Sequence, residues 1–152
     1  MLRHLSLTGF VLFLLSGACF AAAPLFTPER VPVMASSWPE TSGDTFRFVI
    51  LGDKTSGGEG KWPIFDKAVD RINAIAPDFV ITVGDQIPGH MEERAPWDAE
   101  WREWREHARR LTAPLIFIPG NHDIANRACY DYWCQDFGAT YFSFLYRKAL
   151  FL

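Results

Sequence analysis

The sequence predicts an α/β fold built around a βαβαβ unit that is followed by a β-hairpin. Three short apolar runs, at residues 46–51, 79–83 and 115–118, have the length and composition of strands buried in a sheet. The segments between them carry apolar residues at helical spacing. Strands that alternate with helices in this order form a parallel sheet with right-handed crossovers.

Length and composition are those of one globular domain. The chain has 152 residues, of which 49% are hydrophobic and 15% aromatic, so it can bury a core. Fifteen Lys and Arg against eighteen Asp and Glu give a net charge of −3. A domain that binds nucleic acid through its phosphates normally carries the opposite sign, so we expect no general nucleic-acid binding. Three Cys are too few for a disulfide scaffold.

Residues 1–21 have the layout of a secretory signal peptide. A basic start at Arg3 precedes an apolar run over residues 5–15, and small residues around Ala21 follow. We therefore expect cleavage after residue 21, no stable membrane span after cleavage, and export to the periplasm or the extracellular space. Two alternatives stay open: a lipoprotein attached through Cys19, and an uncleaved signal anchor.

The rest of the chain divides into a linker and a domain. Residues 22–45 are rich in Pro, Ser, Thr and Ala without a sustained period, which predicts a linker or a lid. Residues 46–152 form the predicted domain. Because the sequence stops within its last apolar run, we expect this domain to be truncated at its C-terminus.

The first half of the domain consists of a strand, a helix and a second strand. The first strand, residues 46–51, is almost continuously apolar and is expected to be buried on both faces. After a Gly-rich loop, Pro63 suits a first helical turn, and Pro77 ends the helix. The expected apolar face of this helix consists of Ile64, Ala68, Ile72 and Ile75. The second strand covers residues 79–83.

A Trp-rich helix follows, and its apolar stripe is expected to lie in the core rather than to form a stacking platform. The stripe consists of Trp97, Trp101, Trp104, Ala108 and Leu111. Pro114 precedes the third strand, residues 115–118, and a further helical patch lies around Trp133. Residues 140–146 and 149–152 then predict the two strands of a hairpin.

Each of the three core strands ends in a glycine followed by a polar residue. The endings are Gly52-Asp53, Gly84-Asp85 and Gly120-Asn121-His122-Asp123. Ligands of open α/β sheets bind beyond the carboxyl ends of the strands, so we expect these side chains to meet at one edge. Carboxylate and amide oxygens beside an imidazole are ligands that suit a divalent or trivalent metal ion.

These endings resemble the first three motifs of the calcineurin-like metallophosphoesterase family. Asp85 follows Asp53 by 32 residues and Asn121 follows Asp85 by 36, and each interval holds one helix, as in that family. The resemblance covers residues 46–152. It implies the N-terminal half of an αββα sandwich of the metallophosphoesterase type.

Carried over residue by residue, the resemblance implies a role for each polar residue at the edge. Asp53 binds a first metal ion, Asp85 bridges both ions and Asn121 binds the second. His122 contacts the phosphoryl oxygens and protonates the leaving group, and Asp123 orients His122. The implied activity is hydrolysis of a phosphomonoester or phosphodiester by a water molecule that two metal ions activate.

The resemblance also implies cofactors and substrates. Two divalent or trivalent ions, such as Mn, Fe or Zn, are the implied cofactors. The implied substrate is a small-molecule, lipid or nucleotide phosphate ester. His90, in the loop after Asp85, and Lys54, beside Asp53, are weaker candidates for substrate contact.

The sequence departs from the family pattern in two places. Thr55 stands where the family usually has a histidine ligand, as in a branch with Asp-Lys-Thr or Asp-Arg-Thr in the first motif. The later histidine ligands, including a Gly-His-x-His stretch, do not occur in this sequence. We therefore expect the full-length protein to be the enzyme and this chain alone to be inactive.

Two other functions remain alternatives. In a phosphatase of another type, Asp53 would itself attack phosphorus, but such a site needs an acid two residues later, where Thr55 stands. A catalytically impaired, phosphoesterase-like binding module agrees with Thr55 and with the missing histidine ligands. Metal dependence distinguishes these alternatives from a dinuclear hydrolase.

Overall fold

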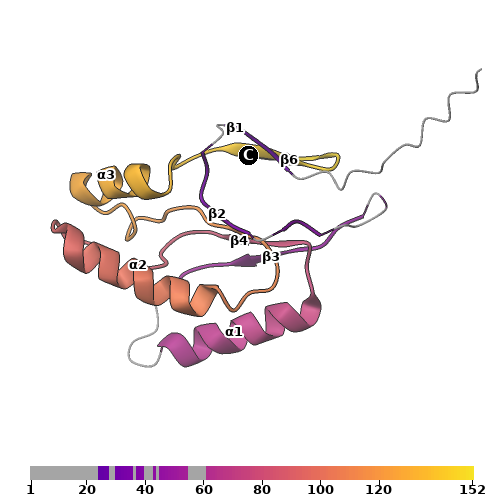
Figure 1. Cartoon of the computed structure of the whole chain (residues 1–152), viewed down its shortest axis with the longest axis horizontal. Coiled ribbons are helices and arrows are strands. Elements are labelled where there is room, and N and C mark those ends of the chain that lie inside the picture. Colours follow the sequence, from indigo (N-terminus) through magenta and orange to yellow (C-terminus); the bar gives the residue numbers. More distant parts are fainter. Residues whose placement is uncertain (1–23, 28–29, 36, 40–42, 44, 55–60) are drawn as a thin grey trace, which may run out of the picture.

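The computed structural model describes residues 24–152 except 28–29, 36, 40–42, 44 and 55–60. The predicted signal peptide and Thr55 therefore lie outside the described residues. Two sheets and three helices make up the described part, which confirms the predicted α/β class (Figure 1). None of these described helices is long and apolar enough to span a membrane. In chain order the elements are β1 (Leu25–Thr27), β2 (Val33–Met34), β3 (Phe48–Leu51), α1 (Lys61–Ile75), β4 (Phe79–Thr82), α2 (Arg94–Ala108), β5 (Leu115–Ile116), α3 (Arg127–Asp136), β6 (Ser143–Tyr146) and β7 (Ala149–Phe151).

The predicted βαβαβ unit forms most of a four-stranded sheet with the order β2-β5-β4-β3. β4 pairs in parallel with β3 on one side and with β5 on the other. Helix α1 connects β3 to β4, and α2 connects β4 to β5. The carboxyl ends of the three parallel strands consequently meet at one edge of the sheet.

The four-stranded sheet is a middle layer between helices α1 and α2 on one side and a smaller sheet on the other (Figure 1). Successive residues of β4 face opposite layers. Val80 packs in the cluster that contains the side chains of α1 and α2, whereas Phe79 packs with Phe144 and Tyr146 of β6. The smaller sheet has the order β1-β6-β7 and contains the predicted hairpin. One helical layer on two sheets is consistent with half of an αββα sandwich.

Two short strands lie within residues 22–45, where the sequence predicts a linker or a lid. β1 pairs antiparallel with β6, so that Phe26 is opposite Phe144. β2 pairs antiparallel with β5, so that Val33 is opposite Ile116. This segment therefore adds an outer strand to each sheet. Strands of two or three residues are too short to show a readable alternation of apolar and polar side chains.

The prediction that the first strand is buried on both faces is wrong. β3 is the outer strand of the described sheet, its side chains alternate between exposed and half-buried, and Ile50 is 62% exposed. All four residues of β4, in contrast, are buried. An apolar run indicates a strand, but the position of the strand in the sheet decides how much of it is covered.

The predicted apolar face of α1 is correct for Ile72, which is buried, and wrong for Ile64 and Ile75, which are exposed. Phe65, Val69 and Ile72 are buried, whereas Ile64 and Ile75 are 68% and 47% exposed. Both sets recur at helical spacing, so the period alone does not separate them. The buried set includes an aromatic ring, which removes a larger apolar area from water.

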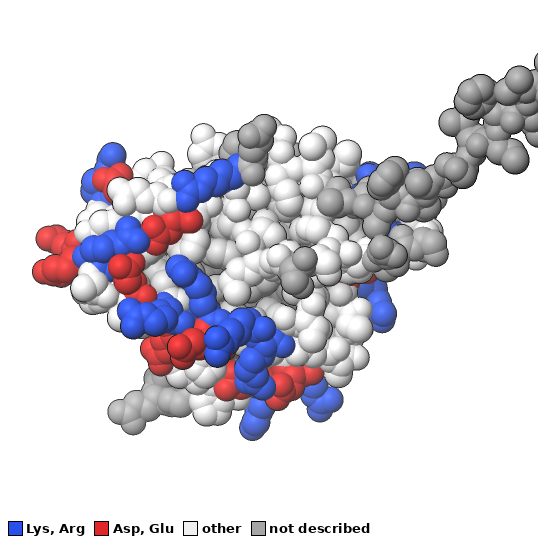
Figure 2. All heavy atoms as spheres, in the orientation of Figure 1, with Lys and Arg blue, Asp and Glu red and all other residues white. Residues whose placement is uncertain are grey.

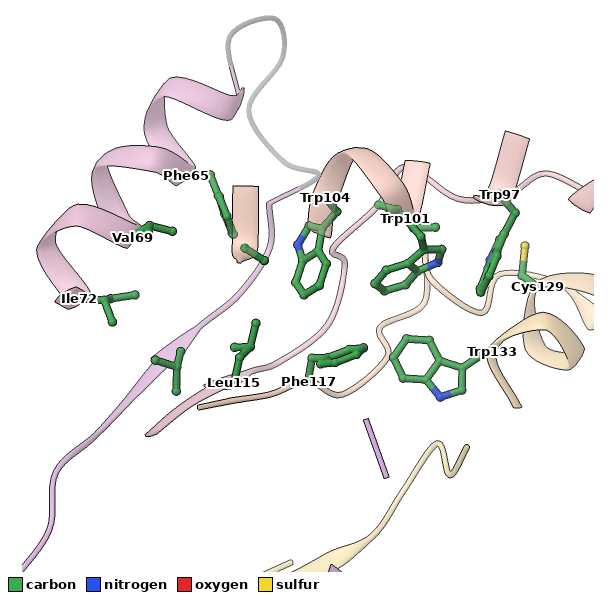
Figure 3. Packing of buried hydrophobic residues seen from close by; sticks show 13 residues of the cluster. Phe65, Val69, Ile72, Trp97, Trp101, Trp104, Leu115, Phe117, Cys129 and Trp133 are labelled. Carbon is green, nitrogen blue, oxygen red and sulfur yellow. The ribbon is translucent and has the colours of Figure 1, made fainter. Parts of the chain in front are cut away.

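The Trp stripe of α2 lies in the core, as the sequence predicts (Figure 3). Trp97, Trp101 and Trp104 have no exposed surface. The Trp101 ring centroid lies 5.5 Å from that of Trp133 in α3, and the Trp104 centroid lies 5.4 Å from that of Phe117. These contacts fix the two helices against each other and against the chain that leaves β5.

Ion pairs connect the helices across their exposed surfaces. Arg110, just after α2, pairs with Asp66 and Asp70 of α1, each at 2.7 Å. Arg94 of α2 pairs with Asp136 of α3 at 2.7 Å. Figure 2 shows a band over the helices in which acidic and basic side chains alternate. Charges of both signs therefore neutralise each other locally on this face.

Two cysteines of the described chain, Cys129 and Cys134, both lie in α3 and are free. Residues five apart on a regular helix point in different directions. Their thiols therefore cannot form a disulfide without unwinding the helix.

Candidate active site

The three strand ends lie side by side at one edge of the four-stranded sheet. The backbone N–H of Asp53, after β3, donates to the carbonyl oxygen of Gly84, after β4, at 3.3 Å. The backbone N–H of His122, after β5, donates to Oδ1 of Asp85 at 3.1 Å. The structure therefore brings together two of the predicted metal ligands and the predicted proton donor.

Glycine is required where the ends of β4 and β5 touch. A Cβ atom on Gly84 would lie 2.5 Å from Cα of Gly120, and a Cβ atom on Gly120 would lie 2.1 Å from Oδ1 of Asp85. Both distances are far shorter than van der Waals contact, so larger residues would push the strand ends apart. Gly84 also has a φ of +100°, which residues with a side chain rarely adopt.

Left-handed backbone conformations occur at this edge in residues that are not glycine. Asp53, Asp85 and His90 have φ values of 58°, 56° and 67°. Each such residue costs about 1–3 kcal/mol and persists only where neighbouring contacts hold it. Two further described non-glycine residues with positive φ, Ala76 and Arg147, lie after α1 and between β6 and β7. Because strained residues cluster at active sites, three of them at one edge favour that edge as the functional site.

Pro88 determines where the neutral His122 ring carries its hydrogen. Nδ1 of His122 lies 2.8 Å from the carbonyl oxygen of Pro88, which can only accept a hydrogen bond. Nδ1 therefore carries a hydrogen, and Nε2 is the ring atom at which a proton can be gained or lost. The ring itself is half-buried.

Asp123 is fully buried and holds the backbone of the loop after β4. Its Oδ1 accepts the backbone N–H groups of residues 86 and 87 at 3.0 and 3.1 Å, and its Oδ2 accepts that of Gly120 at 2.8 Å. Burial raises the pKa of Asp123 to about 6, although these N–H groups oppose the shift. The His122 ring donates its Nδ1 hydrogen to Pro88 of this loop, so an orienting effect of Asp123 on His122 is indirect.

His90, a predicted substrate contact, lies next to His122. The two imidazole rings meet edge to face, with centroids 4.9 Å apart and an angle of 89° between their planes. The backbone N–H of Gly89, one residue earlier, donates to Oε2 of Glu100 in α2 at 2.9 Å. His90 is exposed, so its ring is accessible from solvent at this edge.

Lys54, the other predicted substrate contact, lies against α1. Its Nζ atom is 3.7 Å from the centroid of the Trp62 ring, which makes a cation–π contact. The His107 ring stacks on Trp62, with centroids 3.9 Å apart and an angle of 5° between the planes. Lys54 therefore fastens the end of β3 to the helices, and this contact is an alternative to the predicted contact with substrate.

Four residues that shape this edge are not indicated by the sequence: Pro88, Glu100, Trp62 and His107. Pro88 acts through its backbone carbonyl, which residue type does not reveal. Glu100 and His107 lie among the many polar residues of α2, and no pattern in the sequence separates them from ordinary surface residues. Trp62 and His107 stack across two helices, and a contact between elements leaves no periodic signal in the chain.

The described side chains fit a hard metal ion by their chemistry. Asp53 and Asn121 are exposed and Asp85 is half-buried, so their oxygens are accessible from solvent. Carboxylate and amide oxygens are ligands that hard divalent cations prefer. Within the described ranges, no group of three or more His, Cys, Asp or Glu side chains could hold a metal ion. The candidate set is therefore two carboxylates and one amide.

A cavity of about 100 Å³ lies beside the end of β3, between this strand end and α1. Its lining includes Asp53, Lys54 and Phe65. Two larger cavities, of about 290 and 200 Å³, lie beside β2 and are not lined by any strand-end residue described above. The chemistry of the side chains, rather than cavity size, therefore identifies the candidate site.

Fold and site together define a class of protein: an α/β protein whose polar site lies at the carboxyl edge of a parallel sheet. A model of the calcineurin-like phosphoesterase family matches residues 43–151, and the chain belongs to this family. The match confirms the family resemblance that the strand-end motifs indicate.

Curated relatives include the serine/threonine-protein phosphatase CPPED1 of several vertebrates. The Pongo abelii protein is 34% identical over 113 residues, the Homo sapiens protein 33% over 113 and the Mus musculus protein 32% over 115. Each match covers 66% of this chain but 35% of the relative, so the chain spans about a third of the length of these relatives. No solved structure matches the chain.

Proposed function

We propose that the complete protein hydrolyses phosphate esters and that this chain supplies the first part of its active site. The observation that carries the proposal is the meeting of Asp53, Asp85 and His122 at the ends of three parallel strands. Membership of the calcineurin-like phosphoesterase family supports it. Because the chain spans about a third of its relatives, we expect it to be inactive alone.

We propose that two divalent or trivalent metal ions bind at the carboxyl ends of β3, β4 and β5. Asp53 and Asp85 would hold the first ion, and Asp85 and Asn121 the second. When bound, such ions lower the pKa of the water molecule that attacks phosphorus, and they neutralise charge on the phosphoryl oxygens. A carboxylate suits the shared position because its negative charge offsets the repulsion between two cations.

His122 is proposed as the proton donor to the leaving group. Pro88 holds the Nδ1 hydrogen, so the ring exchanges its second proton at Nε2. An imidazole suits this role because its ordinary pKa lies near neutrality. Once Nε2 has given its proton to the leaving oxygen, the neutral ring keeps its hydrogen on Nδ1.

The proposed substrate is a phosphomonoester or phosphodiester. The curated relatives are named serine/threonine-protein phosphatases, so phosphoserine and phosphothreonine esters join small-molecule, lipid and nucleotide esters as substrates to test. A panel of one ester of each kind, assayed with Mn²⁺, Fe²⁺ and Zn²⁺, identifies the substrate class.

Export to the periplasm or the extracellular space is part of the proposal, through cleavage of residues 1–21 as a signal peptide. Mass spectrometry of the exported protein tests it. An N-terminus at Ala22 supports the proposal. A lipid-modified Cys19, or a retained N-terminal segment, contradicts it.

The experiment that tests the catalytic proposal is substitution of His122 in the complete protein. We expect His122→Ala to lower kcat by about 10²–10⁴, the usual contribution of a positioned proton donor. Metal content, measured by mass spectrometry of the elements, should not change. Asp131→Asn is the control, because Asp131 pairs with the exposed Arg127 on α3, away from the strand ends. Loss of metal in His122→Ala would mean that His122 is a ligand, and absence of turnover in the unaltered protein would contradict the whole proposal.

A binding module without catalysis is the second candidate. One observation favours it: the described part of the chain gathers two carboxylates and one amide, without a third acidic or histidine ligand. Such a module would bind inorganic phosphate or metal in calorimetry without turning over any ester in the panel.

A further inference from the structure

We propose that Glu100 is a positioning residue that holds His90 against His122, so that both imidazoles bind one phosphoryl group. The substrate class that such a pair favours is the phosphomonoester. This inference rests on the proposed function and deepens it, because it names the group that recognises the ester.

The turn that carries His90 has an unusual backbone. Gly89 and His90 are consecutive and both left-handed, with φ values of 65° and 67°. Glycine adopts this conformation readily, but a histidine is strained there. The N–H of Gly89 donates to the carboxylate of Glu100 at 2.9 Å, and hydrogen bonds to charged acceptors are stronger than those between neutral groups. Glu100 therefore stabilises the turn at its strained position.

The same turn packs against both the backbone and the ring of His122. A Cβ atom on Gly89 would lie 1.8 Å from the backbone oxygen of His122, so the two backbones are in direct contact. Pro88, just before the turn, accepts the hydrogen of Nδ1 at 2.8 Å. His90, at its end, places its ring edge to face with the His122 ring. Three successive residues thus hold His122 from different sides.

The segments on either side of this turn are fastened independently of Glu100. Before it, Asp123 binds the N–H groups of residues 86 and 87. After it, the carbonyl oxygen of Met91 accepts from Nδ2 of Asn126 and from Sγ of Cys129, both at 3.0 Å. Loss of the Glu100 carboxylate should therefore release the Gly89–His90 turn without unfolding the whole loop.

The paired imidazole rings of His90 and His122 favour phosphomonoesters over phosphodiesters. Nδ1 of His122 is engaged by Pro88, so that ring offers one nitrogen to the substrate. The exposed His90 ring supplies a further N–H donor beside it. A phosphomonoester carries two negative charges on its terminal oxygens and a diester carries one, so a second imidazole donor favours the monoester.

The experiment compares four variants of the complete protein: His90→Ala, Glu100→Ala, Glu100→Gln and the control Glu106→Ala. Glu106 is an exposed acid on the same helix, six residues from Glu100. We expect His90→Ala and Glu100→Ala to lower kcat/KM for an aryl phosphomonoester by about tenfold or more, the contribution of one charge-assisted hydrogen bond. The loss should appear in KM, and the value for a bis-aryl phosphodiester should change much less. Glu100→Gln keeps an acceptor oxygen and should retain most of the monoester preference, and Glu106→Ala should match the unaltered protein.

A second measurement does not depend on turnover. In NMR spectra, His90→Ala and Glu100→Ala should both shift the His122 ring protons, because the His90 ring is removed in one variant and displaced in the other. Calorimetry with inorganic phosphate should show weaker binding in the same two variants. If no ester is hydrolysed, the NMR and calorimetry measurements still test whether Glu100 holds His90 against His122. Failure of the catalytic proposal can therefore be distinguished from failure of this inference. Equal losses for both esters, or His122 resonances that do not move in Glu100→Ala, would overturn the inference.

Discussion

The end of β3 and the ends of β4 and β5 contribute to the same edge but are held in different ways. Beyond β4 and β5, backbone meets backbone: Gly84 and Gly120 approach too closely for any side chain, and buried Asp123 binds three N–H groups around them. At the end of β3, two backbone hydrogen bonds reach the end of β4, from Asp53 to Gly84 at 3.3 Å and from Val83 to Leu51 at 3.0 Å, and Lys54 rests on a helix through Trp62.

The difference follows from the position of each strand in the sheet. β4 has a parallel partner on both sides and is buried on both faces, whereas β3 is the outer strand of the described sheet. The ligands and the proton donor near β4 and β5 are therefore preorganised by the backbone. Asp53 is held by its backbone hydrogen bond to Gly84, and its neighbour Lys54 by the ring of Trp62 in α1.

The largest expected effect is at the ends of β4 and β5, which backbone contacts hold together. Asp123→Ala leaves two buried N–H groups and one part-buried N–H group without an acceptor. At a cost of about 1–3 kcal/mol for each group, we expect the free energy of unfolding to fall by at least about 3 kcal/mol. Urea unfolding followed by tryptophan fluorescence measures it. Asp53→Ala, at the exposed strand end, should change stability by less than about 0.5 kcal/mol. Equal losses for the two variants would remove the distinction between the strand ends.

A second prediction compares glycines at the two sides. Gly120→Ala places a methyl group on the carboxylate and backbone of Asp85, which cannot move aside, so we expect about 1–3 kcal/mol of destabilisation. Gly52→Ala, after β3, places a methyl group 2.3 Å from a methyl of Val83, whose side chain is 57% exposed and can rotate away. We expect a loss below about 1 kcal/mol there. Thermal unfolding of both variants checks that Gly120→Ala is the more destabilising. A larger loss in Gly52→Ala would contradict the tighter backbone contact between the ends of β4 and β5.

The sequence predicts β4, α2 and the meeting of the strand ends correctly. The run at residues 79–83 and the stripe from Trp97 to Trp104 produce the strand and helix that it indicates, because both elements are buried where pattern and packing agree. The meeting of the strand ends also follows from topology, since parallel strands present their carboxyl ends at one edge. These features depend on local periodicity and on chain order, which a sequence contains.

The remaining features depend on contacts between elements that are distant in the chain. Exposure of Ile50 follows from the outer position of β3, and no residue of that strand reveals its neighbours. The hydrogen bonds from Gly89 to Glu100 and from His122 to Pro88 join residues of different elements, and one of them uses only a backbone oxygen. Such contacts appear only once the fold has been built.

The exposed side of β3 should promote self-association. Ile50 and Ile64 are 62% and 68% exposed near the end of this strand, and an outer strand with apolar side chains favours pairing between chains. We expect residues 22–152 to form oligomers that Ile50→Lys shifts toward monomer, because charge on an outer strand opposes such pairing. Sedimentation velocity measures the distribution. Tyr130→Lys, on the exposed surface of α3, is the control and should leave the oligomers unchanged.

The smallest expected effect concerns the side chains that contact the end of β3. Lys54 lies on Trp62, Trp62 stacks on His107, and His107 donates to Asp66. Asp66 of α1 accepts from Nδ1 of His107 at 2.8 Å and from Arg110 at 2.7 Å. Burial alone would raise the pKa of Asp66, but His107 and Arg110 outweigh it, so the pKa lies below its ordinary value of 3.8. The folded protein therefore binds this proton more weakly than the unfolded chain. The stabilisation is complete above about pH 4 and is lost as the pH falls through the lowered pKa.

Asp66→Asn should consequently reduce the free energy of unfolding at pH 7 by less than about 1 kcal/mol, because the ion pairs are partly exposed. The difference from the unaltered protein should shrink below pH 4, where Asp66 becomes protonated. Asp131→Asn provides the control, since its pair with Arg127 lies on α3, away from the β3 end. Urea unfolding at pH 7, 5 and 3 measures the free energy of unfolding of the unaltered protein and of both variants. A difference that stays constant down to pH 3 would show that the carboxylate stabilises α1 by packing rather than by charge, and the side-chain support of β3 would then not depend on pH.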